Sequence, residues 1–463
     1  MKKLLLHIIV PLILFPVCTT AQFMKDFRPN GSPAVSGTVN LVSVVDAPAA
    51  SIGSRAINTI KESATSATND VWVTGVDALG NVTFSHRYGL AGTDETAAAL
   101  VRCPNGDFIY AATTNAGGTQ SAWLFRRGIM NWSIRYIAPN SRVRTYCIKK
   151  TNENVENYIV AATTNSDRTL LVFKINAGGG LVWNRQYTDV VPPSGLADIP
   201  KSMIINRDTI IIAGNRTTLS VTGAPNRDLF VIGINQVTGA INHPYRVIDN
   251  GSRDEKDPFI NIGMNNEYVL TYQCIANIGG VNTGRIAFTR LNALLGLLIP
   301  PTSLLWENNT FNSFGHSIYP GSTPGAITYD IGGGTYGGNM NNPLFVSISN
   351  LGVPLAGSYR RLWTNLNLNS TFMMQSAFGP ANRQEHHNFK QVAGQNSMSL
   401  LRDNTVPSPC NVSLVINQQY VQASIIQRVY NATPQITQTT YQVPNFVVNG
   451  AITNCNSGAI SSF

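Results

Sequence analysis

The chain has 463 residues, only 12% of them charged, and its formal net charge is +9. The basic residues are scattered along the sequence rather than clustered, which argues against a nucleic-acid partner. After residue 22 the sequence shows no apolar run of about 20 residues, so we expect no transmembrane helix in the mature chain.

The N-terminus has the features of a secretory signal peptide. Met1 is followed by two lysines, the segment from Leu4 to Val17 is largely apolar, and Thr19-Thr20-Ala21 precedes Gln22. This pattern predicts a signal peptide at 1–21 and an exported protein, secreted or held in the outer envelope. A lipoprotein anchored at Cys18 is the less favoured alternative, because the residues before this cysteine are not small.

A hairpin-like unit recurs along the following chain. Asp77-Ala78-Leu79-Gly80 has the residue preferences of a type I turn between strand-forming residues. An aromatic residue follows the turn glycine after four positions and a tyrosine follows it after eight. Three copies share these offsets: Gly80, Phe84 and Tyr88; Gly128, Trp132 and Tyr136; and Gly179, Trp183 and Tyr187.

Looser copies place further turn glycines at Gly239, Gly296 and Gly352, so the glycines recur every 48 to 60 residues. The pentapeptide Ala-Ala-Thr-Thr-Asn also occurs twice, at 111–115 and 161–165. Each unit thus holds about four strands, and a unit of this length made of strands is typical of a β-propeller blade. We expect an all-β propeller of seven four-stranded blades over 36–407, with six or eight blades as alternatives.

The repeat also predicts how the blades pack and how the ring closes. Phe84, Trp132 and Trp183 are expected to be equivalent residues packed between neighbouring blades, not lining a ligand site. Closure needs a strand from one terminus to complete the last blade. The segment from Thr38 to Ala47 is our candidate because it precedes the first full hairpin, and 22–35 is then expected to be a linker.

The stretch from Phe84 to Thr114 resembles the SBBP-type β-propeller repeat of secreted bacterial proteins. It contains a strand ending in Tyr-Gly, then Gly-x-Asp, a strand, an Asn-Gly-Asp turn and a strand ending in Thr. The resemblance is close over this unit and fades toward the C-terminus. It implies a propeller fold in a protein of the Gram-negative envelope or beyond it. It assigns no catalytic residue, since the pattern consists of turn and packing positions.

The C-terminal segment, 408–463, departs from the repeat. It is rich in Val, Ile, Thr, Tyr and Gln, which predicts β-structure, either as a small appended unit or along the rim of the propeller. Export permits disulfides. We expect Cys410 to be joined to Cys455, since both lie in this segment. Cys103 and Cys147 occupy similar places in consecutive units and either pair between adjacent blades or remain buried thiols.

The search for chemical motifs is largely negative. No histidine occurs in a His-Glu-x-x-His arrangement, and the pair His386-His387 is expected in a solvated loop. The segment 249–257 holds four acids, of which Asp249, Asp254 and Asp257 offer oxygen ligands for Ca²⁺. Their spacing differs from that of an EF-hand, so we favour a polar loop between strands.

Two classes of function remain. The favoured one is a non-enzymatic binding or scaffold module whose loops contact a protein or glycan at the cell surface. The alternative is an extracellular polysaccharide hydrolase or lyase. A glycosidase needs paired carboxylates in the central pocket, and few acids lie in the regions expected to form the innermost strands. The sequence alone therefore assigns no catalytic residue and no firm cofactor.

Overall fold

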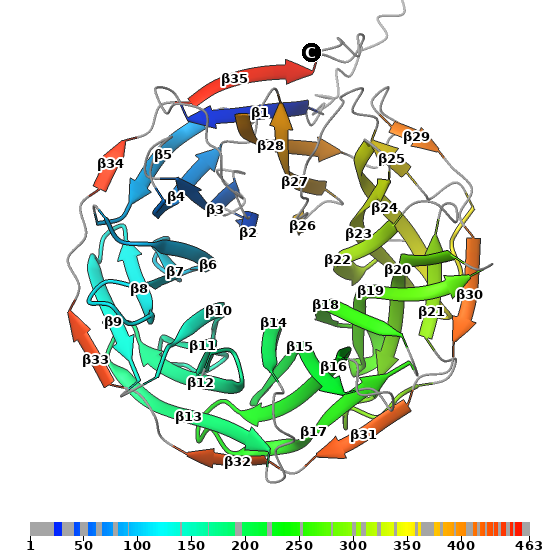
Figure 1. Cartoon of the computed structure of the whole chain (residues 1–463), viewed down its shortest axis with the longest axis horizontal. Coiled ribbons are helices and arrows are strands. Elements are labelled where there is room, and N and C mark those ends of the chain that lie inside the picture. Colours follow the sequence, from blue (N-terminus) through cyan, green and yellow to red (C-terminus); the bar gives the residue numbers. More distant parts are fainter. Residues whose placement is uncertain are drawn as a thin grey trace, which may run out of the picture.

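The chain forms a ring of antiparallel β-sheets, which we describe from a computed structural model (Figure 1). Among the described residues there are seven sheets, each of five strands. The structure describes residues 23–29, 41–46, 54–61, 67–76, 82–90, 92–138, 141–164, 166–189, 197–219, 225–250, 253–278, 281–298, 302–306, 312–321, 326–337, 340–356, 360–362, 375–379, 383–392, 395–403, 411–413, 417–421, 424–428, 430–433, 437–440, 445–447 and 450–455.

The sheets are numbered here as blades in chain order, with strands given from the axis outward. Blade 1 contains β2 (Leu41–Asp46), β3 (Ser54–Lys61), β4 (Asn69–Val76), β5 (Val82–Tyr88) and β34 (Asn445–Val447). Blade 2 contains β6 (Glu95–Arg102), β7 (Phe108–Thr114), β8 (Ser121–Arg127), β9 (Trp132–Ile137) and β33 (Thr437–Thr440). Blade 3 contains β10 (Arg144–Lys150), β11 (Asn157–Thr164), β12 (Thr169–Asn176), β13 (Leu181–Asp189) and β32 (Tyr430–Thr433).

Blade 4 contains β14 (Asp198–Asn206), β15 (Thr209–Leu219), β16 (Pro225–Asn235), β17 (Ile241–Asp249) and β31 (Ser424–Arg428). Blade 5 contains β18 (Asp254–Ile262), β19 (Tyr268–Ile278), β20 (Val281–Leu291), β21 (Thr302–Trp306) and β30 (Asn417–Val421), with the short 3₁₀ helix η1 (Met264–Asn266) after β18. Blade 6 contains β22 (Asn312–Pro320), β23 (Thr328–Gly337), β24 (Met340–Ser349), β25 (Arg360–Leu362) and β29 (Asn411–Ser413). Blade 7 contains β26 (Gln375–Gly379), β27 (Arg383–Val392), β28 (Gln395–Asp403), β1 (Phe23–Pro29) and β35 (Gly450–Cys455).

The predicted all-β propeller is confirmed. The innermost strands contact one another in sequence around the axis, and β2 of blade 1 meets β26 of blade 7, so the ring is closed. Each sheet has the four strands predicted for a blade and a fifth strand at the rim, which comes from the C-terminal segment.

The N-terminal strand β1 closes the ring. It pairs antiparallel with β28 and so supplies the fourth strand of blade 7. The prediction that Thr38–Ala47 would do this is wrong: β2 lies within that segment and is instead the innermost strand of blade 1, paired with β3. The expected linker at 22–35 contains β1. Two β-rich segments precede the first recognisable hairpin, and the sequence does not show which of them pairs with the distant β28.

The C-terminal strands β29–β35 form a belt around the ring, as Figure 1 shows in orange and red. They join blades 6, 5, 4, 3, 2, 1 and 7 in that order, opposite to the order in which the blades are built. The rim alternative for this segment is therefore the one that the structure shows. An exposed fourth strand is an open edge that can pair with other chains, and the belt covers each of these edges.

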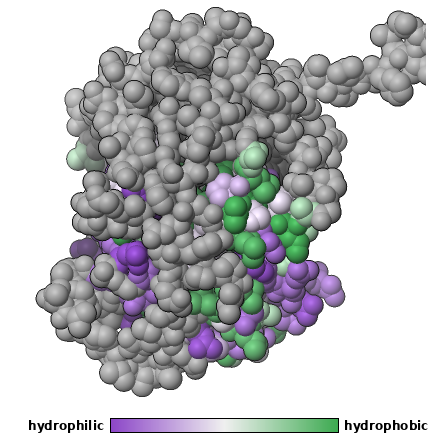
Figure 2. Space-filling model, turned by 90° about the vertical axis from the view of Figure 1, so that its right-hand side faces the viewer, coloured by the Kyte–Doolittle hydropathy of each residue, from purple (hydrophilic) through white to green (hydrophobic). Residues whose placement is uncertain are grey.

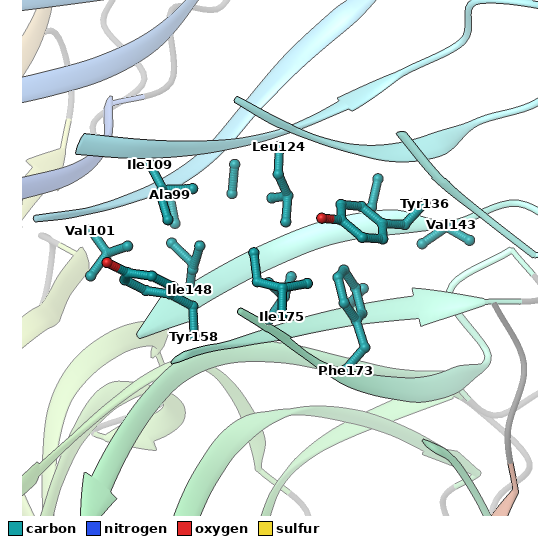
Figure 3. Packing of buried hydrophobic residues seen from close by; sticks show 14 of the residues in the cluster. Ala99, Val101, Ile109, Leu124, Tyr136, Val143, Ile148, Tyr158, Phe173 and Ile175 are labelled. Atoms are coloured by element: carbon teal, nitrogen blue, oxygen red, sulfur yellow. The ribbon is translucent and has the colours of Figure 1, made fainter. Parts of the chain in front are cut away.

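The core consists of apolar layers between neighbouring blades. Figure 3 shows the layer between blades 2 and 3, where Leu124 and Tyr136 face Ile175 and Phe173. All seven residues of β7 are buried, because alternate side chains face the blade on either side. This arrangement explains the apolar runs without alternation.

The repeated aromatic residues tie each blade to the next. Trp132 donates its indole N–H to the carbonyl of Ala177 (3.0 Å), and Tyr136 donates its hydroxyl to the carbonyl of Gly179 (2.6 Å); both acceptors lie in the β12–β13 turn of the next blade. Gly179 has a φ of 81°, and a Cβ there would lie 2.5 Å from Ile134. Glycine is therefore needed at this turn for two reasons: the positive φ, and the lack of space for a side chain next to the neighbouring blade.

The same contacts recur one blade further on. Trp183 donates to the carbonyl of Gln236 (3.3 Å) and Tyr187 to that of Gly239 (2.7 Å). Phe84 is partly buried against the layer between blades 1 and 2. Of the repeat residues identified in the sequence, Gly80 lies outside the described residues.

The predicted pairing of Cys103 with Cys147 is wrong, since both thiols are free. Cys103 lies in the layer between blades 2 and 3, whereas Cys147 lies in the layer between blades 3 and 4. They also occupy different places in their blades, since Cys103 follows the end of β6 whereas Cys147 lies at the bulge near the start of β10. Cys274 is also buried and free.

Within the described residues there is no helix with the length and apolar character that crossing a membrane requires. Some hydrophobic side chains are nevertheless exposed, among them Leu294 and Leu351 in turns of blades 5 and 6. Figure 2 views this side of the ring and shows hydrophobic residues next to hydrophilic ones.

The packing role of Trp183 can be tested by mutation. The side chain is 8% exposed, so Trp183→Ala should lower the free energy of unfolding by ~3–5 kcal/mol, the usual cost of truncating a buried aromatic residue. The neighbouring Val182 is 50% exposed, and Val182→Ala is the matched control. Chemical denaturation measures both variants, and a loss below about 1 kcal/mol for Trp183→Ala would contradict the packing role.

The disulfide between Cys410 and Cys455 remains a prediction. Cys410 lies outside the described residues but directly precedes β29 in the sequence, and Cys455 is the last residue of β35. These strands belong to blades 6 and 7, which are neighbours. The bond would therefore join the two ends of the belt, contributing on the order of 4 kcal/mol in the chain-entropy model. Mass spectrometry of a non-reduced digest should find this link; two free thiols would disprove it.

Candidate active site

The two faces of the ring carry different connections. Successive strands of a blade are antiparallel, so one face carries the turns between first and second and between third and fourth strands; we call it the hairpin face. The other face carries the loops between second and third strands and the links to the next blade, and we call it the connection face. The candidate site lies on the axis, toward the connection face.

A register shift occurs near the start of the innermost strand in each of blades 1 to 6. It falls between Leu41 and Ser43, Ala97 and Ala99, Thr145 and Cys147, Pro200 and Ser202, Lys256 and Phe259, and Gly315 and Ser317. Such a bulge leaves a residue without a partner on the next strand and redirects its side chain. In blades 3 to 6 the residues at this point include Tyr146, Lys201, Asp257 and His316, which we call the channel ring.

Lys201 and Asp257 form an ion pair between blades 4 and 5. The Nζ–Oδ1 distance is 2.8 Å, and both side chains are about one-third exposed. Asp257 has a φ of 55°, and its backbone N–H donates to Oδ1 of Asn215 (2.8 Å), which stabilises this unusual conformation. Burial alone would raise the pKa of Asp257, but the charge and hydrogen bond of Lys201 outweigh burial and lower it.

His316 lies close enough to Lys201 and Asp257 to interact with both charges. Burial lowers its pKa to about 4; Asp257 opposes this shift and Lys201 reinforces it. The imidazole is therefore neutral near pH 7 and has a lone pair for accepting a proton. Its ring packs beside that of Phe314, with centroids 4.6 Å apart.

Tyr146 is the aromatic member of the channel ring. Its hydroxyl donates to Oδ1 of Asp167 (2.9 Å), an oxygen that also accepts from Thr163, and Oδ2 of Asp167 pairs with Arg144 (3.3 Å). Burial, followed by the charge of Asp167, raises the pKa of Tyr146 above its ordinary value, although Arg144 opposes the shift. The phenol therefore keeps its proton at neutral pH and can act as a proton donor.

A cavity of about 330 Å³ lies along the axis, lined by the innermost strands of blades 2 to 6. Tyr146 and Lys201 line it together with Arg102, Lys149 and Tyr319. The Nε of Arg102 is buried and has no hydrogen-bond partner among the described residues. Three cationic side chains thus line one cavity, which favours an anionic ligand.

The acids considered for Ca²⁺ separate in the structure. Asp254 accepts the backbone N–H of Arg227 (2.9 Å), and Asp257 belongs to the channel ring. Asp249 instead lies with Asp228 and Glu255 in a group whose carboxylate oxygens are within 4.8 Å of one another. The ligand set predicted from the sequence is therefore wrong except for Asp249. The expected polar loop is also wrong from residue 254 on, because these residues form the innermost strand β18.

His386 and His387 lie in β27, not in the solvated loop that we expected. No sequence motif pointed to Tyr146, Lys201 or His316. The sequence gives only a weak sign that these three residues share a site, because each lies in the first strand of its unit, next to residues that continue the strand. Only the pairing register reveals that these positions are bulges.

No protein family and no curated protein sequence matches the chain, so the resemblance to the SBBP-type repeat remains a prediction. Several solved structures are similar at low identity. The polysaccharide lyase Uly1 is 10% identical, with 81% of this chain and 93% of that chain covered and a TM-score of 0.47. An α-L-arabinofuranosidase from Fusarium graminearum is 11% identical, with 66% and 93% covered and a TM-score of 0.40. An exo-β-1,3-galactanase from Phanerochaete chrysosporium is 10% identical, with 92% and 100% covered and a TM-score of 0.32.

These comparisons contradict the preference for a non-enzymatic binding module, because the similar structures are those of glycan-degrading enzymes. The preference depended on a scarcity of acids in the innermost strands. In fact β18 alone contains Asp254, Glu255 and Asp257, which had been placed in a loop. With TM-scores below 0.5 the neighbours do not define this chain's chemistry, which has to be inferred from its own residues.

The lowered pKa of His316 predicts a change of stability with pH. Between the ordinary value of 6.5 and the folded value of about 4, the unfolded chain binds a proton at this residue and the folded chain does not. The His316 contribution therefore lowers the free energy of unfolding as the pH falls through this window and is constant above it. Denaturant unfolding should show a smaller loss on acidification for His316→Gln than for the unmodified protein. Equal losses would contradict the burial of this imidazole.

Proposed function

We propose that the protein is an exported enzyme that cleaves an acidic polysaccharide by β-elimination at the channel ring. The observation that carries the proposal is the placement of a neutral imidazole, a protonated phenol and a lysine at equivalent bulges of the innermost strands of blades 6, 3 and 4. His316, Tyr146 and Lys201 supply these groups. Proton transfer in both directions is what an elimination requires.

The charge of the cavity indicates the substrate class. Arg102, Lys149 and Lys201 line it, and Asp257 balances one of these charges through its ion pair with Lys201. The remaining positive charge suits the carboxylates of a uronate-containing chain. Neutralising a uronate carboxylate also makes the proton on the adjacent carbon more acidic, so binding and catalysis use the same cations.

The step conserves atoms and electrons within the substrate. The imidazole of His316 takes the proton from C5 of the uronate, and the electron pair of that bond forms a C4–C5 double bond. The C4–O bond breaks, and the departing oxygen takes the proton of Tyr146. The products are an unsaturated uronate and a new reducing end, and His316 returns its proton through solvent to Tyr146. No water, oxidant or reductant is consumed.

Binding of the substrate would raise the pKa of His316, the proposed base. A pKa near 4 makes the free His316 a weak base, whereas an effective base has a pKa near the working pH. A bound uronate carboxylate would bring negative charge beside the imidazole and raise this pKa. Elimination fits the site better than hydrolysis, because Asp257 pairs with Lys201 and Asp167 accepts from Tyr146, so neither carboxylate has the separate acid or base role of a glycosidase.

The test is cleavage of purified polysaccharides by the mature protein. Uronate-containing chains should yield products with the ultraviolet absorbance of an unsaturated uronate, and neutral chains should yield none. His316→Gln and Tyr146→Phe should each lower kcat by about 10²- to 10⁴-fold, the range for loss of a general acid or base. Arg168→Ala is a matched control, since this exposed residue lies at the connection face outside the channel ring.

Two outcomes would overturn the proposal. New reducing ends without ultraviolet absorbance would show hydrolysis in place of elimination. Unchanged activity in both His316→Gln and Tyr146→Phe would move the reaction away from the channel ring.

A further inference from the structure

A second polar group lies away from the axis, between blades 4 and 5 at the connection face. Asp228 is near the start of β16, Asp249 ends β17, and Glu255 is the second residue of β18. Their carboxylate oxygens lie within 4.8 Å of one another. Asp228 is 5% exposed and Glu255 is 0% exposed, so this is not a cluster of solvated surface acids.

Two buried oxygens at this place have no hydrogen-bond partner among the described residues. Oε1 of Glu255 accepts from the thiol of Cys274 (3.6 Å), but Oε2 has no partner. Asn250, which is 1% exposed, donates its Nδ2 to the hydroxyl of Tyr272 (3.0 Å), while its Oδ1 has no partner among the described residues. Buried polar atoms are satisfied in the great majority of cases. These two oxygens therefore point to a ligand, because no described residue donates to them.

The equivalent place between blades 1 and 2 has a different charge pattern. There Val71 of β4 pairs with Tyr88 of β5, and Asp70 is the residue before Val71. Arg87 forms an ion pair with Asp70 (3.1 Å). In blade 4, Asp228 precedes the Leu229–Ile248 pair. By this alignment Val247 stands in the position of Arg87, and Asp249 in that of Gly89.

The cluster between blades 4 and 5 has thus gained an acid relative to its counterpart, and its cation comes from another strand, since Arg216 of β15 stands opposite Asp228 where Ile60 of β3 stands opposite Asp70. Two arginines lie nearby: Arg253 donates Nη1 to the backbone O of Asn250 (2.7 Å), and Arg216, opposite Asp228 in register, has its Nη1 3.6 Å from Asp198. Neither contact involves the partnerless oxygens of Glu255 and Asn250.

We propose that Asp228, Asp249, Glu255 and Asn250 bind a divalent cation, Ca²⁺ by preference, between blades 4 and 5. All four side chains offer oxygen, the donor that hard cations select, and they offer no nitrogen or sulfur of the kind that zinc prefers. Ca²⁺ accepts irregular sets of six to eight oxygens, whereas Mg²⁺ demands near-ideal octahedral geometry. A site assembled from three strands of two blades fits the more tolerant ion.

The ion would join the third and fourth strands of blade 4 to the first strand of blade 5. It would hold the start of β18 two residues before Asp257, and so support the bulge of the channel ring from behind. The site is separate from the cavity and does not depend on the proposed reaction. Its presence can therefore be established whether or not a substrate is found.

The experiment uses the full mature protein treated with a chelator. Added Ca²⁺ should raise the Tm in a saturable manner, because an ion that binds the folded state alone stabilises it by mass action. Metal analysis after dialysis should find one Ca²⁺ per chain. Mg²⁺ at the same concentration should give a smaller shift.

Glu255→Gln should abolish both the bound Ca²⁺ and the Tm shift, and in chelator it should be about as stable as the unmodified protein, since burial raises the pKa of Glu255 and the amide then replaces a neutral carboxyl group of the same size. Glu95→Gln is the matched control: Glu95 is the buried acid at the start of β6 and accepts from Thr114 (3.0 Å). This variant should keep the Ca²⁺-dependent shift. No Ca²⁺-dependent shift in the unmodified protein, or an unchanged shift in Glu255→Gln, would overturn the proposal.

Discussion

The structure depends on one constraint: each blade is a sheet with two apolar faces, and both must be covered. Residues of β7 alternate between the layers toward blades 1 and 3, as Tyr110 and Ile109 do. No blade can bury both faces unless it has a neighbour on each side, so the array is stable only as a closed ring. Closure by β1 and cover by the belt at the rim follow from this requirement, and the belt links all seven blades through backbone hydrogen bonds.

The same constraint explains why the channel ring consists of bulges. In a regular innermost strand, side chains alternate between the two neighbouring blades and contribute to the packed layers. A side chain reaches the axis when the alternation is interrupted, and a bulge provides that interruption at the cost of local pairing. Blades 1 to 6 each carry a bulge near the start of this strand, and four consecutive blades place a polar residue there. The fold thus supplies a ring of positions at which function can change without altering the core.

How much could be read from the sequence depends on the distance between interacting segments. Local signals identified the repeat, its turn glycines and Trp132 and Trp183 as packing residues, because hairpin geometry is encoded within a few residues. The pairing of β1 with β28 joins residues that are far apart in the sequence, so composition favoured the wrong segment. We expected Asp257 in a loop because charged residues surround it in the sequence. In the structure it lies within the strand β18, at a bulge. Turn geometry fixes the register within a hairpin, but a single sequence does not show which distant strands pair or where a bulge shifts their register.

The two faces of the ring differ in how their charges are satisfied. At the hairpin face the third strand of a blade repeatedly ends in a cation that pairs with an acid of its own blade and donates to a turn carbonyl of the next. Arg126 pairs with Asp107 and donates to Ala177, Lys174 pairs with Glu153 and donates to Gln236, and Arg290 pairs with Glu267 and donates to Asn350. These groups complete one another and hold the blades together. At the connection face Oε2 of Glu255 and Oδ1 of Asn250 have no hydrogen-bond partner among the described residues. The proposed reaction and the proposed cation site both lie at this face, where the innermost strands depart from regular pairing.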